Sequence, residues 1–136
     1  MFCCALVGDD YAQSQATVRV SDLMSAIGGD TDSCTRGTAG DTVQGQRHEE
    51  VDVPARTLSS VLDEATIGPI DLIVLDVERR ELDVLAGLDL DRHAPRYLLI
   101  EALEPEAMRA RYDAMLAPTM RFAEAISPYD LLYERA

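Results

Sequence analysis

Three acidic side chains stand where two apolar runs of the chain end. Asp76 and Glu78 close the run at residues 70–78, and Glu101 closes the run at residues 97–101. A carboxylate can take a proton as a general base or supply oxygen ligands to a divalent cation. These acids are therefore candidates for a catalytic base or for the ligands of a divalent cation.

A structural role for the same region is the alternative. Glu78 and Glu81 are three residues apart near the start of a predicted helix, where the helix dipole favours acids. Glu81 would then simply be solvated. Asp76 and Glu78 are therefore the first candidates, ahead of Glu101 and then of Glu81.

A strand-helix-strand unit at residues 69–101 is predicted to position these acids. Both apolar runs lack the alternation of a half-buried strand, which is typical of parallel strands buried on both faces. Leu82, Leu85 and Leu88 recur between them at helical spacing. Because ligands of open α/β sheets bind beyond the carboxyl ends of the strands, the acids should converge on that edge.

The motifs around the acids resemble those of a known family. They are Val-Pro-Ala-Arg-Thr-Leu at residues 53–58, Ile-Asp-Leu at 70–72, Asp-Val-Glu-Arg-Arg-Glu-Leu-Asp-Val-Leu-Ala-Gly-Leu at 76–88 and Leu-Leu-Ile-Glu at 98–101. In this order they are similar to the C-terminal half of an FkbM-type methyltransferase, which commonly shows Asp-Val-Glu-Gly-x-Glu followed by a Val-Leu-x-Gly helix. The resemblance covers residues 51–136 well and residues 1–8 weakly.

This resemblance implies an α/β fold with a partial Rossmann-like methyltransferase sheet, mostly parallel, that ends in a C-terminal antiparallel strand pair. It also implies S-adenosylmethionine as cofactor and O-methylation of a hydroxyl on a small molecule or sugar. Asp76, Glu78 and Glu101 are then the predicted catalytic residues, because a base must take the proton of the acceptor hydroxyl. No metal is predicted, since no His joins the carboxylates at ligand spacing.

Two positions depart from the pattern of that family. Arg79 stands where the family usually has Gly, and Val74 stands where it often has Lys. Glycine permits a close backbone approach or a positive φ, which arginine adopts only at a cost. Either the local geometry has shifted or the site is degraded, and the change to valine also removes a cation that could pair with Asp76 and Glu78.

The cofactor half of such a fold is not evident in the sequence. In this fold a Gly-rich turn after the first strand opens the helix that holds the cofactor. Residues 1–9 resemble the third strand of the family instead, and the glycines between residues 28 and 45 do not form Gly-x-Gly-x-x-Gly. We therefore expect one truncated domain over residues 1–136, and the residues that bind the cofactor are unknown.

Charge and composition exclude several classes of protein. The 136 residues include 12 Lys plus Arg against 25 Asp plus Glu, and the net charge of -13 repels nucleic acids and anionic membranes. No apolar stretch approaches the ~20 residues that span a bilayer, and the start lacks the features of a signal peptide, so we expect a cytoplasmic location. Three cysteines without Cys-x-x-Cys spacing predict neither a disulfide framework nor a zinc site.

The remaining elements are predicted from local signals. They are a hairpin of strands at residues 2–7 and 16–20, a flexible loop at 28–47, a short strand at Val51 and Val53, a helix capped by Thr57 and stopped at Gly68, a helix from Pro105 to Pro118, and two final strands near residues 120–126 and 131–133. The loop is either a lid or a disordered insertion.

Two other functions compete with methyl transfer. A noncatalytic α/β module could have lost its cofactor half, which would leave the strand that begins at Ile70 as an open sheet edge. A homodimer or a companion chain could cover that edge. A metal-dependent hydrolase built on the same acids is the third candidate. His93 is predicted to have a surface or turn role, at the end of the sheet opposite the acids.

Overall fold

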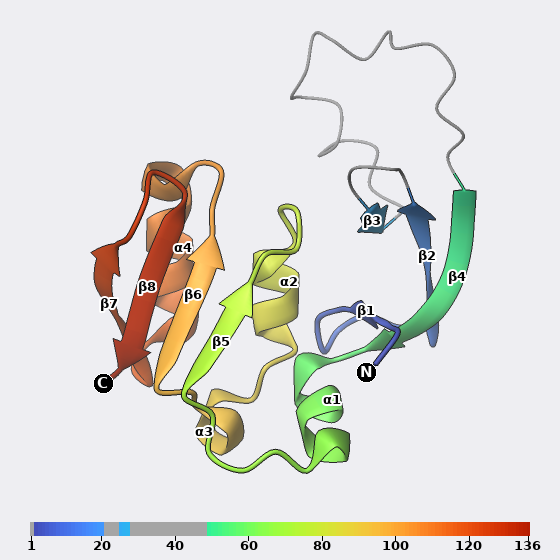
Figure 1. Ribbon diagram of the computed structural model, residues 1–136, viewed down its shortest axis with the longest axis horizontal. Helices are drawn as coiled ribbons and strands as arrows, with labels where there is room; N and C mark the ends of the chain where they lie inside the picture. Colours follow the sequence, from blue (N-terminus) through green and yellow to red (C-terminus); the bar gives the residue numbers. More distant parts are fainter. Residues whose placement is uncertain (1, 21–24, 28–48) are drawn as a thin grey trace, which may run out of the picture. The chain divides into compact units, whose positions relative to one another are not determined.

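The computed structural model describes residues 2–20, 25–27 and 49–136. The described residues fall into two compact units, one within Met1–Ala5 and Ala12–Ala55 and the other within Leu6–Tyr11 and Arg56–Ala136. Each unit contains one small sheet, and the predicted α/β class is confirmed (Figure 1). The predicted flexible loop at 28–47 lies outside the described residues, and the single truncated domain stays a prediction.

The first sheet has the strand order β1-β4-β2-β3. Its strands are β1 (Ala5–Leu6), β2 (Gln15–Val20), β3 (Ser25–Ile27) and β4 (Glu49–Arg56). Strand β2 is antiparallel to both β3 and β4. The predicted hairpin of residues 2–7 with 16–20 is wrong, because β4 pairs along the whole of β2 and lies between it and β1.

The second sheet has the strand order β5-β6-β8-β7. Its strands are β5 (Leu72–Leu75), β6 (Tyr97–Glu101), β7 (Met120–Ala125) and β8 (Asp130–Arg135). Strands β5 and β6 are parallel, as the strand-helix-strand prediction requires, and β7 and β8 form the predicted antiparallel pair. The predicted mostly parallel sheet is wrong, since β8 also runs antiparallel to β6 and only the β5–β6 pairing in this sheet is parallel.

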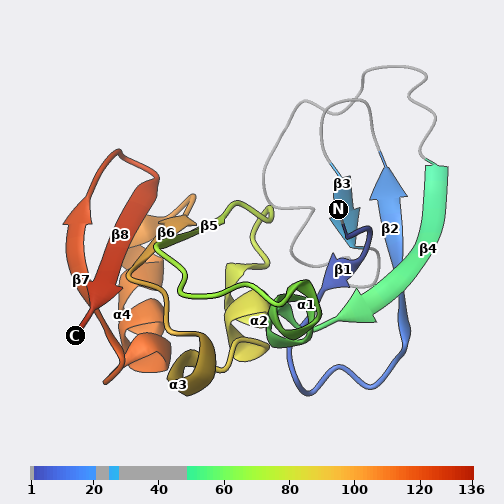
Figure 2. The same cartoon turned by 60° about the horizontal axis from the view of Figure 1, so that its bottom comes forward.

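Helices accompany the second sheet. They are α1 (Leu58–Ala65), α2 (Glu81–Ala86), α3 (Leu90–His93) and α4 (Pro105–Leu116). Figure 2 shows α2, α3 and α4 on one face of this sheet. The predicted cap is confirmed, because the Thr57 hydroxyl accepts a hydrogen bond from the Ser60 amide at 3.2 Å. No helix in the described part of the chain has the length and apolar character needed to cross a bilayer.

The core lies between the second sheet and its helices. Side chains from α2, β6, α4 and β8 are fully buried there, namely Val84, Leu98, Ile100, Tyr112, Leu116 and Tyr133. Strand β5 differs, since Leu72 is 50% and Val74 57% exposed. The predicted burial of this strand on both faces is wrong, because the helices α2, α3 and α4 lie on only one face of the sheet.

Gly87, the last position of the Val-Leu-x-Gly motif, is required by close packing. A Cβ at this position would collide with the Val7 carbonyl oxygen and would lie 3.1 Å from the Thr57 Cβ. The Gly87 carbonyl also accepts a hydrogen bond from the Ser59 amide at 3.0 Å. The end of α2 is therefore joined to the start of α1 at a distance that only glycine permits.

Substitution of this glycine should destabilise the fold through steric overlap. We expect Gly87→Ala to lower the free energy of unfolding by about 1–3 kcal/mol, the usual cost of overpacking. Gly68→Ala is the matched control, because a Cβ there has no atom within 4 Å, and it should change stability by less than about 0.5 kcal/mol. Urea unfolding of both variants measures the difference, and equal effects would contradict the packing role of Gly87.

Candidate active site

The structure brings the predicted acids to the carboxyl ends of β5 and β6. Asp76 and Glu78 lie in the turn between β5 and α2, and Glu101 is the last residue of β6. The parallel register pairs Leu75 with Ile100, so the residues that follow each strand are neighbours at the same edge. Asp76 and Glu78 are exposed, and Glu101 is half-buried.

Glu101 is the electrostatic centre of this group of acids. A side-chain hydrogen bond with Asp76 raises the pKa of Glu101 above its usual value of 4.5, and burial and the charges of Asp76, Glu78 and Asp130 raise it further. A carboxylate with a raised pKa is a stronger base than an ordinary carboxylate. Of the three predicted acids, Glu101 is thus the one whose surroundings suit it to proton transfer.

Asp130 is a member of this group that sequence reasoning missed. It is the first residue of β8 and pairs with Glu101 across the antiparallel ladder. Its carboxylate also accepts a hydrogen bond from the Ser127 hydroxyl. Because β8 reaches β6 from 29 residues further along the chain, no local signal in the sequence places this acid beside Glu101.

The β5–α2 turn keeps the backbone geometry that favours glycine. Glu78 has φ 50° and Arg79 has φ 73°, both in the left-handed region. Arginine adopts here the positive φ that glycine would adopt without strain, and the two outcomes expected for Arg79, a shifted geometry or a degraded site, stay predictions.

Glu81 stabilises this strained turn. Its carboxylate accepts a hydrogen bond from the Arg79 amide at 3.1 Å, and the residue is only 4% exposed. The interpretation of Glu81 as a solvated side chain is wrong. Its place in the first turn of α2 agrees with the preference of acids for the start of a helix.

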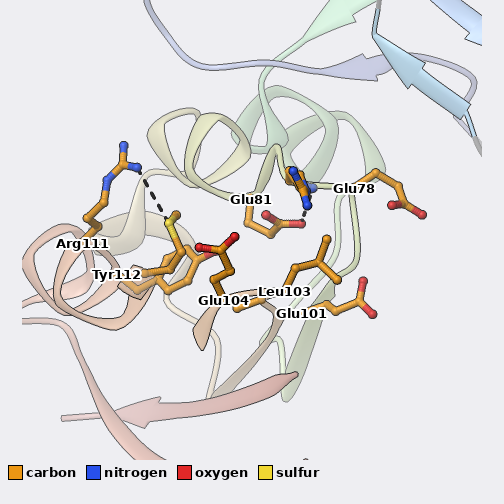
Figure 3. Close-up of a pocket in the computed structure, with 10 residues that line it drawn as sticks. Glu78, Glu81, Glu101, Leu103, Glu104, Arg111 and Tyr112 are labelled. Carbon is orange, nitrogen blue, oxygen red and sulfur yellow. Dashed lines mark hydrogen bonds between the residues drawn. The ribbon is translucent and has the colours of Figure 1, made fainter. Parts of the chain in front are cut away.

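A pocket of about 250 Å³ adjoins the acids. It is lined by residues of the β5–α2 turn, α2, the end of β6 and α4, namely Glu78, Arg79, Glu81, Glu101, Ala102, Leu103, Glu104, Met108, Arg111 and Tyr112. Figure 3 shows the Glu81 and Glu104 carboxylates near its centre, with those of Glu78 and Glu101 to one side. The lining is thus acidic, with apolar walls from Leu103 and Met108.

Tyr112, a residue of the pocket, is a second residue that is absent from the sites predicted from the sequence. It is 1% exposed, and burial together with the negative charge of Glu81 raises the pKa of Tyr112 to about 12. The phenol therefore stays protonated at neutral pH and can donate a hydrogen bond. No motif in the sequence marks it as a residue that lines the pocket.

Metal ligands and His93 are the other features that the sequence analysis considered for the site. Among the described residues, no group of three or more His, Cys, Asp and Glu side chains could hold a metal ion. His93 lies in α3 at the opposite end of β6, as predicted, and its Nε2 is 3.0 Å from an Asp63 carboxylate oxygen. It is therefore remote from the acids.

Comparison with known proteins gives a match to a protein family. The family model described as the methyltransferase FkbM domain matches residues 1–124. No curated protein and no solved structure matches the chain. The matched range includes the β5–α2 turn, the end of β6 and α4, and so it contains every residue that lines the acidic pocket.

Because Arg79 has a positive φ, we expect its replacement by glycine to change the stability of the fold. Arg79→Gly should raise the free energy of unfolding by about 1 kcal/mol, because a left-handed backbone costs a residue with a Cβ roughly that amount. Arg80→Gly is the matched control, since Arg80 has φ -105° and pairs with Asp83 at 2.8 Å, and it should lower stability. Urea unfolding measures the free energy of unfolding of both variants. A loss of stability in Arg79→Gly would contradict the strain at this turn.

Proposed function

We propose that this chain, which belongs to the FkbM methyltransferase family, methylates a hydroxyl of a small molecule or sugar. Methyltransferases of this family use S-adenosylmethionine. The observation that supports the proposal within the fold is the pairing of Glu101 with Asp76 beside the acidic pocket. We also propose that the parallel β5–β6 unit is part of a Rossmann-like sheet, as in that family.

Methyl transfer needs the donor and the acceptor held in line and a base for the proton of the acceptor hydroxyl. When bound, S-adenosylmethionine supplies a methyl group on a positively charged sulfur, which keeps the electron pair of the broken C–S bond as the acceptor oxygen takes the methyl in line. We assign Glu101 the role of the base that receives the proton of the acceptor hydroxyl. Asp76 supports it, because its hydrogen bond and charge raise the pKa of Glu101. Glu78 adds a further negative charge.

The pocket suits a small polar acceptor. Its volume of about 250 Å³ is just below the ~300–1,000 Å³ of most ligand pockets. Carboxylates such as those of Glu81 and Glu104 accept hydrogen bonds from hydroxyl groups, and the protonated Tyr112 phenol can donate one. This combination of acceptors with a donor favours a ligand rich in hydroxyls, such as a monosaccharide.

The same residues fit only part of the cofactor. The carboxylates of the pocket suit the positive charge of the sulfonium sulfur. The two strand-to-helix turns at this edge, at residues 76–80 and 102–104, contain no glycine that would let the backbone approach a nucleotide. We therefore assign the acceptor to this pocket and leave the adenosine half without assigned residues.

The second candidate function is a noncatalytic module that binds a protein partner. Strand β5 is at the edge of its sheet, and the exposed side chains of Leu72 and Val74 lie on it. An open edge with apolar side chains invites pairing with another strand. A second copy of the chain or a companion chain would cover β5 in this case.

Calorimetric titration with S-adenosylhomocysteine tests the proposal. We expect saturable binding to the 136-residue chain. Glu101→Gln should bind this ligand within about threefold of the wild type, yet transfer of radiolabelled methyl to sugar acceptors should fall by about 10²-fold or more, the usual contribution of a general base. Asp91→Asn, which neutralises an exposed acid of α3, is the control and should change neither value.

The contradicting result is a folded wild-type chain, verified by circular dichroism, that does not bind. Light scattering on the same sample then separates the alternatives. A dimer that binds no S-adenosylhomocysteine would favour the noncatalytic module that pairs through β5. A monomer that binds none would exclude both methyl transfer by this chain alone and pairing between copies.

A further inference from the structure

A second pocket lies at the opposite end of β5 and β6 from the acids. Its volume is about 600 Å³. It is lined by the loop that precedes β5, by the end of α3 and the start of β6, and by the end of β8, namely Ile67, Gly68, Pro69, Ile70, Asp71, Arg92, His93, Ala94, Arg96 and Arg135. No residue of this pocket lines the acidic pocket.

The second pocket is rich in positive charge, although the chain as a whole is negatively charged. Arg92, Arg96 and Arg135 line it with one carboxylate, that of Asp71. The net charge of the chain is -13, and all its permanent cationic side chains are arginines, since the sequence contains no lysine. Arginine presents a planar fork of donors that matches the oxygens of a phosphate.

Backbone pairing holds two of these arginines side by side. The Arg135 amide donates a hydrogen bond to the Arg96 carbonyl at 3.0 Å, and the Arg96 amide donates to the Ile70 carbonyl at 2.9 Å. The positions of Arg96 and Arg135 are therefore fixed by the ends of β6 and β8. Like charges on neighbouring strands destabilise a sheet unless something neutralises them.

Two acids next to this pocket, Asp63 and Asp89, pair with Arg92. Arg92 pairs with Asp63 at 3.2 Å and with Asp89 at 3.7 Å, and His93 also contacts Asp63. Arg96 lies over the Tyr97 ring, 5.2 Å from its centroid. Within the described residues, neither Arg96 nor Arg135 forms an ion pair. Arg96 and Arg135 are both exposed residues, so an anion from solvent can reach them.

We propose that this second pocket binds a phosphate group through Arg96 and Arg135, with Arg92 at its rim. The ligand is either free phosphate or the phosphoryl group of a small molecule. A dianion would offset the repulsion between the two neighbouring arginines, which the single carboxylate of Asp71 offsets only in part. The site is independent of methyl transfer, because it lies at the amino ends of the strands that carry the acids at their carboxyl ends.

Calorimetric titration at low ionic strength tests this site, with inorganic phosphate and ribose 5-phosphate as the two probes. We expect saturable binding of at least one probe to the wild type, and at least tenfold weaker binding to Arg96→Gln and to Arg135→Gln. Arg121→Gln is the matched control, because it removes the same charge from β7 of the same sheet and does not line the pocket. Its affinity should stay within about twofold of the wild type.

The probes also distinguish the two sources of phosphate. Tighter binding of ribose 5-phosphate would support a phosphorylated small molecule, and equal binding would support free phosphate. Two results would overturn the site. One is that neither probe binds the wild type saturably. The other is that Arg121→Gln loses as much affinity as the other variants do, because that loss would mean diffuse attraction of the anion to positive charge. Circular dichroism of each variant verifies that the chain is folded.

Discussion

The parallel pairing of β5 with β6 is the constraint on which the second unit depends. Four consecutive residue pairs, from Leu72 with Tyr97 to Leu75 with Ile100, fix the register of the two strands. A slip by one residue would turn the buried side chains of Leu75 and Ile100 toward the other face of the sheet, so the core enforces this register. Because the register is fixed, the residues that follow both strands meet at one edge, and those that precede them meet at the other.

The acidic edge combines this pairing with a strained turn. Glu78 and Arg79 adopt positive φ directly after β5, and the buried carboxylate of Glu81 accepts the amide hydrogen of Arg79. Helix α2 then ends at Gly87, where the close contact with Val7 and Thr57 leaves no room for a side chain. The motif at residues 76–88 thus has two structural roles: its first residues form the turn, and its glycine allows close packing at the end of α2. In the proposed function, residues such as Asp76 and Glu101 supply the chemistry.

Local signals predicted the elements that carry the site. The strand-helix-strand unit, the cap at Thr57, the helix start at Pro105 and the final antiparallel pair all have short-range causes, namely apolar runs, a hydroxyl before a helix, and proline at its first turn. The acids at the strand ends follow from the same runs. Their meeting at one edge was predictable once the two strands were taken as parallel.

Contacts between distant segments were not predictable in this way. Strand β4 lies between β1 and β2 because it pairs with segments that are distant in the sequence. The sequence favoured a hairpin of β1 with β2 instead, because these two strands are close together along the chain. The burial of Glu81, the approach of Asp130 to Glu101 and the pairing of Arg96 with Arg135 likewise depend on how strands and helices assemble. The apolar residues of β5 also did not indicate that one face of this strand would be exposed.

The interaction between Glu101 and Asp76 is the claim that the proposed site most needs, and NMR can measure it directly. The carboxyl carbon of Glu101, followed by its ¹³C chemical shift during a pH titration, should show a midpoint above 4.5 in the wild-type chain. Asp76→Asn removes the neighbouring negative charge and should lower that midpoint, whereas Asp91→Asn should leave it unchanged. An ordinary midpoint that does not respond to Asp76→Asn would contradict the account.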